Sequence, residues 1–431
     1  MREMKNIGMR LPDDLWFVAI LLPVVTLYRW RSERQLYRAL SSAMEACLGY
    51  FVTCIGVAAL PLATNPLLNL IHSAFGVSGA IMNSEAYGMS LLPEFGSVAL
   101  LIMFAAFAIN VLLARLTPFK GVFLTAHHLL YMALFTAMVL QTSGLPMYVV
   151  LAVGALLLGL YGWIVVSLTH RSTGKIMGIK SVGLANSSSS AALIGRAAVH
   201  LCGSSQERYT RESGRHSSSI GGIPSLSSAG LFINYILLCL YVGPERADAV
   251  FSAGGWLFNC LARALLFGAL TTVLLSGIRM LLSSVVELFH VLADRYAKGC
   301  WMGLDATAII SICPRAWNAG FFCSCLGSSV AMAFMLLFQA PFVPVLSPSS
   351  MYFAGGVAGV CGNAWGNKQT ARIAGFLTGA ATTLVIGAMA ANLGNYAEMG
   401  VIFGETEYGI YGLILETIGK VFLKFAFNTD V

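Results

Sequence analysis

Long uncharged apolar runs constrain this chain more than any other feature. The segment Met147–Leu168, MYVVLAVGALLLGLYGWIVVSL, contains no charged residue, and neither does Ser97–Ala114. Runs of about 18 or more such residues are typical of helices that cross a bilayer. Because runs of this kind recur along the sequence, we expect an all-α polytopic membrane protein.

The composition agrees with this class and argues against others. Hydrophobic residues make up 57% of the chain and charged residues 10%, whereas about a quarter of the residues in a soluble domain are charged. The net charge of +7 lies in short segments between apolar runs, so we expect a lipid bilayer around the chain and no nucleic-acid partner. The cysteines are scattered without the spacing of metal ligands, and we expect no metal and no cofactor.

Two basic segments set the expected topology. The first is Arg29–Arg38 and the second is Thr169–His216. Counting spans between them places both on the same side of the membrane, and cationic loops are typical of the cytoplasmic side. The sequence therefore predicts that both segments are cytoplasmic.

The distribution of polar residues predicts a single transport domain over residues 1–431, made of two membrane halves. The halves cover about residues 15–168 and 229–424, and a Ser-rich hydrophilic loop at 169–228 separates them. By the criterion of about 20 residues per span, we expect about ten to eleven transmembrane helices.

Three segments are too polar or too rich in glycine to be ordinary spans. They are Gly76–Met89, Gly303–Gly320 and Ala354–Thr370. Irregular backbone at membrane depth is tolerated only where protein or a cavity surrounds it, because unpaired N–H and C=O groups are costly in hydrocarbon. Interruptions in both halves of a chain point to a transporter site, so we expect re-entrant hairpins here.

The chain resembles the ascorbate-type membrane IIC component of the bacterial phosphotransferase system. The segments that carry the resemblance include FLTAHH, SGIRMLLSSVVELF, GLDATAIISICPRAWNAGF and GNAWGNKQTARIAG, which occur in the family's order between about Leu15 and Leu415. The resemblance implies a homodimeric, multi-pass carrier of the bacterial inner membrane. It also implies two inverted repeats, with a core domain that moves substrate like an elevator against a dimerisation domain.

The same resemblance implies the substrate and the partners. The substrate would be a sugar or an ascorbate-like sugar acid, which a cytoplasmic IIB protein, itself supplied by IIA, phosphorylates. Chemistry on the sugar would belong to IIB, so we expect no catalytic residue in this chain.

Five residues match positions that contact substrate in the resembling family. They are Ser84, Glu85, His127, Tyr131 and Asp305. His128 is a further candidate, although adjacent helical residues point about 100° apart, so we expect only one histidine to face a cavity and prefer His127. The alternatives are structural: a packed histidine, and Asp305 as a helix N-cap.

Two departures from the family bear on substrate choice. Leu184 and Ala185 stand where the family has a histidine and glutamines, and Glu85 stands where an aromatic residue is more frequent. These changes alter the hydrogen-bonding groups and the field that an anionic sugar would meet. Arg279 and Glu287 lie eight residues apart, a helical spacing that places them on one face, and we expect them to form structural pairs at the cytoplasmic end rather than to contact substrate.

Two other functions are compatible with a polytopic membrane chain. One is a carrier without phosphorylation, linked to protons through His127, Glu85 and Asp305, since such groups also build proton relays. The other is a membrane enzyme. The sequence lacks a Gly-x-Ser-x-Gly elbow and a His-Glu-x-x-His helix, which argues against the enzyme.

Overall fold

The computed structural model describes residues 11–202, 207–210, 222–251, 255–310, 312–390 and 400–427. These residues form 15 α-helices and no sheet-dominated domain. Seven of the described helices are long and apolar enough to cross a membrane. The prediction of an all-α polytopic membrane protein is therefore confirmed.

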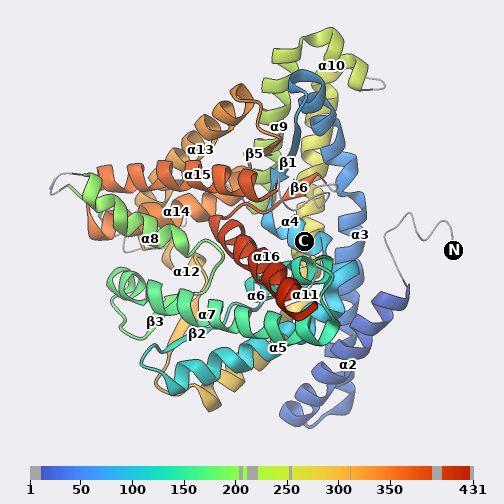
Figure 1. The fold of residues 1–431 in the computed structure, drawn as a ribbon, viewed down its shortest axis with the longest axis vertical. Coiled ribbons are helices and arrows are strands. Elements are labelled where there is room, and N and C mark those ends of the chain that lie inside the picture. The colour runs from blue at the N-terminus through green and yellow to red at the C-terminus, as the bar shows by residue number, and fades with distance from the viewer. Residues whose placement is uncertain are drawn as a thin grey trace.

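One group of helices forms an elongated body, which we call the scaffold lobe. Its members are α2 (Leu11–Glu33), α3 (Leu36–Phe75), α9 (Ile223–Val242), α10 (Pro244–Val250) and α11 (Trp256–Tyr296). Helices α3 and α11 have 40 and 41 residues, so each is about 60 Å long at the helical rise of about 1.5 Å per residue. They run along one side of the molecule in Figure 1.

The remaining elements form the core lobe, which extends away from the long helices in Figure 1. Its helices are α4 (Ser84–Ser90), α5 (Leu92–Leu116), α6 (Ala126–Thr142), α7 (Met147–Met177), α8 (Ser190–Ala197), the 3-10 turn η1 (Ala198–Leu201), α12 (Thr307–Ile310), α13 (Pro314–Leu337), α14 (Pro348–Trp365), α15 (Lys368–Ala390) and α16 (Thr406–Phe427). Helices α13, α14 and α15 pack on one another, and α5 packs on α6 and α7.

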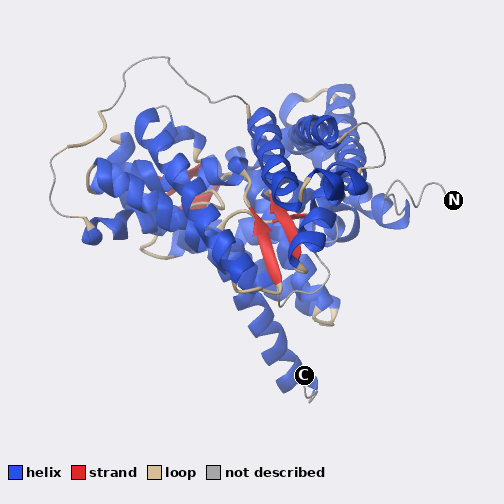
Figure 2. Cartoon of the chain, turned by 90° about the horizontal axis from the view of Figure 1, so that it is seen from above, coloured by secondary structure: helices blue, strands red, loops and turns tan. Residues whose placement is uncertain are grey.

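Short strands lie among these helices, as Figure 2 shows. They are β1 (Ser78–Met82), β2 (Gly121–Phe123), β3 (Val182–Leu184), β4 (Trp301–Leu304), β5 (Phe342–Val345) and β6 (Val401–Ile402). They form two parallel sheets, in the orders β5-β1-β6 and β2-β4-β3. Each sheet supplies hydrogen bonds to extended backbone that would otherwise be unpaired at membrane depth.

The two sheets show that the chain is built from two repeats. The order α3-β1-α4-α5-β2-α6-α7-β3-α8 in the first half matches α11-β4-α12-α13-β5-α14-α15-β6-α16 in the second. In each sheet the central strand is the first strand of one repeat, and its neighbours are the second and third strands of the other. This exchange ties the halves together and brings residues from both to the same place.

The described helices also bear on the predicted number of spans. The seven that meet the length and hydropathy criterion are α3, α5, α7, α9, α11, α13 and α15. Helices α2, α6, α14 and α16 have 17 to 23 residues. Within the described residues, these four helices are the candidates for the further spans needed to reach the predicted ten to eleven.

The structure differs from the sequence interpretation between the two halves. The expected hydrophilic loop at 169–228 is folded in its first part, where α7 continues to Met177 and β3, α8 and η1 follow. Ser187 and Ser189 are buried with partners for their hydroxyl groups; for example, the Ser189 hydroxyl donates to the Asn186 carbonyl over 2.6 Å. Residues 203–206 and 211–221 of the expected loop lie outside the described residues.

Two of the three segments expected to interrupt ordinary spans do contain short or extended elements. Gly76–Met89 contains β1 and a short helix, and Gly303–Gly320 contains the end of β4 and the short α12. The third segment, Ala354–Thr370, was expected to be irregular, but it lies mainly in the regular helix α14, which ends at Trp365. Its small residues serve helix packing instead, which is the usual role of glycine between membrane helices.

Helices α3 and α11 cross at glycines. A Cβ atom added at Gly49 would overlap the backbone of Leu281 and Gly277, and one added at Gly277 would overlap the Thr53 hydroxyl. Glycine therefore allows the two backbones to approach each other closely. This crossing fixes the geometry of the scaffold lobe.

We predict that Gly49→Ala destabilises the fold, because the added methyl group forces the two helices apart. Overpacking of this kind costs about 1–3 kcal/mol, which should appear as a lower melting temperature in detergent. Gly222→Ala is the control, since its Cβ would meet nothing nearer than 3.5 Å. Equal melting temperatures for Gly49→Ala and the unmodified chain would contradict the packing argument.

Candidate functional site

A cavity of about 430 Å³ lies between the two lobes. Its polar lining consists of Glu85, His127, His128, Tyr131, Asn186, Arg279, Ser283, Asp305, Thr307 and Glu405. Helix α11 of the scaffold lobe supplies one wall, with Leu275, Ile278 and Leu282 among its apolar residues. A cavity of this size with a few convergent polar groups is typical of a small-molecule site.

The carboxyl ends of the strands place the polar residues. His127 and His128 follow β2, Asn186 follows β3, and Asp305 follows β4. These strands are parallel neighbours, so the residues that follow them meet at one edge of the sheet.

The other sheet contributes in the same way. Glu85 follows β1 and Glu405 follows β6, and these strands are also parallel neighbours. In both sheets, therefore, the carboxyl ends of the strands and the starts of the helices that follow point toward one cavity. Helices that begin at membrane depth beside a cavity are a recurring feature of transporter sites.

A hydrogen-bonded network joins His128, Asn186 and Asp305. The Asn186 amide nitrogen lies 2.7 Å from His128 Nε2 and donates to Asp305 Oδ1 over 3.0 Å. The amide oxygen accepts from the Ser188 N–H over 2.7 Å, which fixes the orientation of the side chain. Because an amide N–H₂ group only donates, His128 Nε2 must accept.

The tautomer of His128 follows from this network. A neutral imidazole that accepts at Nε2 carries its proton on Nδ1, and Nδ1 lies 3.0 Å from the Ser187 hydroxyl oxygen. Both ring nitrogens of His128 therefore have protein partners. The ring is held in place at the wall of the cavity.

His127 is placed differently. Its Nε2 lies 3.7 Å from Asp305 Oδ2, and the two side chains are 34% and 27% exposed. That exposure leaves atoms of both residues open to a molecule in the cavity. The pair comes from opposite halves of the chain and combines an N–H donor with a carboxylate acceptor.

A comparison with known protein families decides the identity of the chain. Residues 17–407 match the family model EIIC-GAT, described as the sugar-specific permease component of the phosphotransferase system. The chain belongs to this family. It is thus a multi-pass membrane protein that transports sugar within a phosphotransferase system, together with partner proteins of that system.

The sequence interpretation of the permease had placed one histidine in the cavity, but both line it. Their ring centroids are 4.3 Å apart. Both belong to the first turn of α6, which begins at Ala126. Because that turn starts at the cavity wall, two neighbouring side-chain directions reach the cavity.

The other predicted site residues divide into two groups. Tyr131 and Glu85 line the cavity with the histidines and Asp305. Ser84 is buried behind the wall, where its hydroxyl donates to the Glu405 carboxylate and accepts from the Gly404 N–H. Ser84 therefore positions Glu405, and Glu405 is the residue of this pair that lines the cavity.

The expectation that Arg279 and Glu287 form structural pairs, and do not line the site, holds for Glu287 and is wrong for Arg279. Arg279 lines the cavity, and Glu287 pairs with Arg29, whose Nη1 lies 2.8 Å from Glu287 Oε2. Two turns of helix separate Arg279 from Glu287 along α11, a distance that places them at different depths.

Several lining residues did not belong to the predicted site set, among them Asn186, Arg279 and Glu405. Arg279 and Glu405 are charged residues beside apolar segments, and such intramembrane charges are functional candidates. Asn186 lies in the Ser-rich run that looked like a surface loop. Its position depends on the pairing of β3 with β4, which the sequence does not reveal.

His127, His128 and Asp305 could also be considered as metal ligands, since one donor atom of each lies within 4.8 Å of the others. A metal at His128 would have to displace Asn186 or Ser187 from its ring nitrogens. His127 and Asp305 need no such exchange to meet a sugar hydroxyl. The arrangement fits a hydroxyl-bearing ligand better than an ion.

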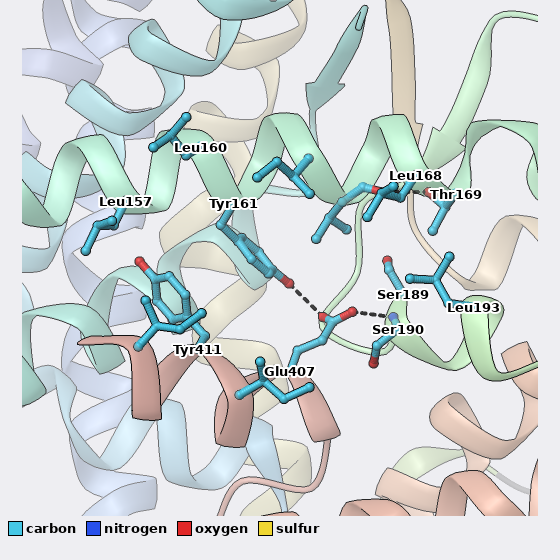
Figure 3. A pocket seen from close by; sticks show the side chains of 14 residues that line it. Leu157, Leu160, Tyr161, Leu168, Thr169, Ser189, Ser190, Leu193, Glu407 and Tyr411 are labelled. Carbon is cyan, nitrogen blue, oxygen red and sulfur yellow. Dashed lines mark hydrogen bonds between the residues drawn. The ribbon is translucent and has the colours of Figure 1, made fainter. Parts of the chain in front are cut away.

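A second cavity, of about 370 Å³, lies among α7, α8 and α16. Figure 3 shows Glu407 inside it, between Tyr161 and Ser190. The Glu407 carboxylate accepts from the Tyr161 hydroxyl over 2.6 Å and from the Ser190 N–H. Most of the other lining residues are leucine, isoleucine or valine. These bonds join α16 to α7 and α8, and the apolar walls do not suit a sugar.

We predict that Asp305→Asn and His127→Ala each weaken sugar binding by about tenfold to a hundredfold. Each would remove a charged or polar group that we expect to contact the sugar, and hydrogen bonds to charged groups are worth about 1.5–3 kcal/mol. Isothermal titration of the purified permease measures the change. If both residues contact one ligand, the double variant should lose less than the sum of the two single losses.

His290→Ala and Asp294→Asn are matched controls. Both residues are exposed on α11 outside the cavity, so neither substitution should change the affinity. Normal binding by both Asp305→Asn and His127→Ala would show that the sugar binds elsewhere.

Proposed function

We propose that this permease carries a neutral, hydroxyl-rich sugar or polyol through the cavity between its lobes. The observation that carries the proposal is the charge of the lining. Glu85, Asp305 and Glu405 line the cavity together with a single arginine among its lining residues, Arg279. Three carboxylates and one guanidinium favour groups that donate hydrogen bonds, which sugar hydroxyls do.

The same lining favours one of the two substrate classes that the resemblance allows, the neutral sugar, over the other, the sugar acid. A sugar acid such as ascorbate would bring a negative charge close to the partly exposed Asp305 and Glu85, and like charges in a partly desolvated site repel strongly. A neutral sugar avoids this cost and keeps the hydroxyl contacts. The volume of about 430 Å³ lies within the usual range for small-molecule pockets.

The position of the cavity supports an elevator-type mechanism. Asp305, His127 and Glu405 follow strands of the core lobe, while α11 supplies a largely apolar wall from the scaffold lobe. Movement of the core lobe along such a wall would carry the sugar without breaking its contacts to the core. We further propose that the scaffold lobe forms the interface of a homodimer.

We assign the energy source to phosphorylation by a cytoplasmic IIB protein, supplied by IIA, with the permease in the bacterial inner membrane. The second candidate is a proton-linked carrier, which the three carboxylates at the cavity favour. The two differ in the product. Phosphorylation yields sugar phosphate inside the cell, whereas proton coupling yields unmodified sugar and acidifies the interior.

A binding screen against purified permease tests the substrate class. We predict that a neutral pentose, hexose or polyol binds, and that ascorbate and gluconate bind at least about tenfold more weakly than the best neutral ligand, which corresponds to about 1.4 kcal/mol. Glu85→Gln should narrow this gap, because it removes a charge and keeps the shape. Tighter binding of ascorbate than of every neutral sugar would contradict the proposal.

Glu245→Gln is the matched control for Glu85→Gln. Glu245 lies in α10, away from the cavity, so this variant should keep the discrimination of the unmodified permease. An equal change in both variants would mean that the effect comes from net charge and not from the site.

A further inference from the structure

Asn186 stands out among the residues at the cavity because every polar atom of its side chain is used within the protein. The amide oxygen accepts from Ser188 N–H, and the amide nitrogen contacts His128 and Asp305. The residue is 1% exposed. No atom of this side chain is left over for a ligand, so its contribution has to act through its neighbours.

We propose that Asn186 is the positioning residue of the sugar site, which sets the tautomer of His128 and the orientation of the Asp305 carboxylate. The predicted effect of Asn186 on sugar binding rests on the proposed function. The effect on His128 follows from the network and does not require a sugar.

The first consequence concerns His128. The Asn186 N–H donates to Nε2, which leaves the ring proton on Nδ1, where it faces the Ser187 hydroxyl. Without the donor at Nε2, the proton is free to move to that nitrogen. His128 would then present an N–H toward Asp305 and compete with His127 for the carboxylate.

The second consequence concerns Asp305. Its Oδ1 accepts from Asn186 over 3.0 Å and lies 3.4 Å from the Thr307 backbone nitrogen. These partners hold one carboxylate oxygen, so that Oδ2 lies on the side of His127, at 3.7 Å from its Nε2. The oxygen that a sugar hydroxyl meets is thereby fixed in direction.

Asn186 also links the two repeats of the chain. His128 and Asn186 follow strands of the first half, and Asp305 follows the central strand of the same sheet, which belongs to the second half. The single amide of Asn186 therefore aligns His128, from the first half of the chain, with Asp305, from the second half. Its conservative carboxylate variant, Asn186→Asp, would lose both donors and put two carboxylates side by side.

Nitrogen NMR of protein labelled with ¹⁵N-histidine, recorded without sugar, tests the assignment directly. We expect the unmodified permease to show His128 as the neutral Nδ1–H tautomer. Asn186→Ala should shift His128 to the Nε2–H form or to a mixture. An Nε2–H or doubly protonated His128 in the unmodified permease overturns the inference without any variant.

His170 provides an internal reference. Its Nδ1 lies 3.2 Å from the Val182 carbonyl oxygen, so it also carries the proton on Nδ1, and its ring stacks on Trp301. His128→Gln and His170→Gln assign the two signals. Asn186→Ala should move the signal of His128 and leave that of His170 unchanged; movement of both would indicate a general loss of structure.

Asn110→Ala is the matched control for a merely structural role. Asn110 is also a buried asparagine at this sheet, where it donates to the Gly121 carbonyl and accepts from the Phe123 N–H. Its loss should lower the melting temperature without changing the tautomer of His128. If Asn110→Ala shifts the His128 signal as Asn186→Ala does, the positioning role is contradicted.

Sugar affinity completes the test. We expect Asn186→Ala and Asn186→Asp to weaken binding about tenfold or more, with the larger loss in Asn186→Asp. A shifted tautomer with unchanged sugar affinity would overturn the role of Asn186 in binding. An unmodified permease that binds no sugar but shows the Nδ1–H tautomer would instead contradict the proposed function and leave the network assignment standing.

Discussion

The exchange of strands between the two repeats is the constraint on which the rest of the structure depends. Extended backbone at membrane depth needs hydrogen-bond partners, because lipid offers none. Here β1 obtains them from β5 and β6, and β4 obtains them from β2 and β3. Neither half of the chain can complete a sheet by itself, so the two halves must fold together, and the residues after each strand meet in the cavity.

Much of the fold could be predicted from the sequence, because long apolar runs have few alternatives in a bilayer. The re-entrant segments Gly76–Met89 and Gly303–Gly320 could also be recognised, since small and polar residues interrupt apolar patterns there. The folded structure of the segment after Thr169 could not be recognised from the sequence. Asn186 forms hydrogen bonds with Ser188 N–H and with Ser189 in a compact turn. Composition alone does not distinguish such a turn from a solvated loop.

The candidate site divides in the same way. His127 and Asp305 were recognisable as polar residues beside apolar segments, and the structure brings them within 3.7 Å. Asn186, Arg279 and Glu405 reach the cavity through tertiary packing that no local pattern records. Arg279 shares a helix face with Glu287, but Glu287 pairs with Arg29 of α2, and Arg279 lies at the cavity.

A structure of the permease with its sugar bound tests the central claim most directly. Our account predicts sugar density in the cavity beside α11, with hydroxyl groups within hydrogen-bond distance of Asp305 Oδ2 and His127, while Asn186 keeps its contacts to His128 and Asp305. Sugar density at another place, such as the apolar cavity around Glu407, with no contact to Asp305 or His127, would contradict it.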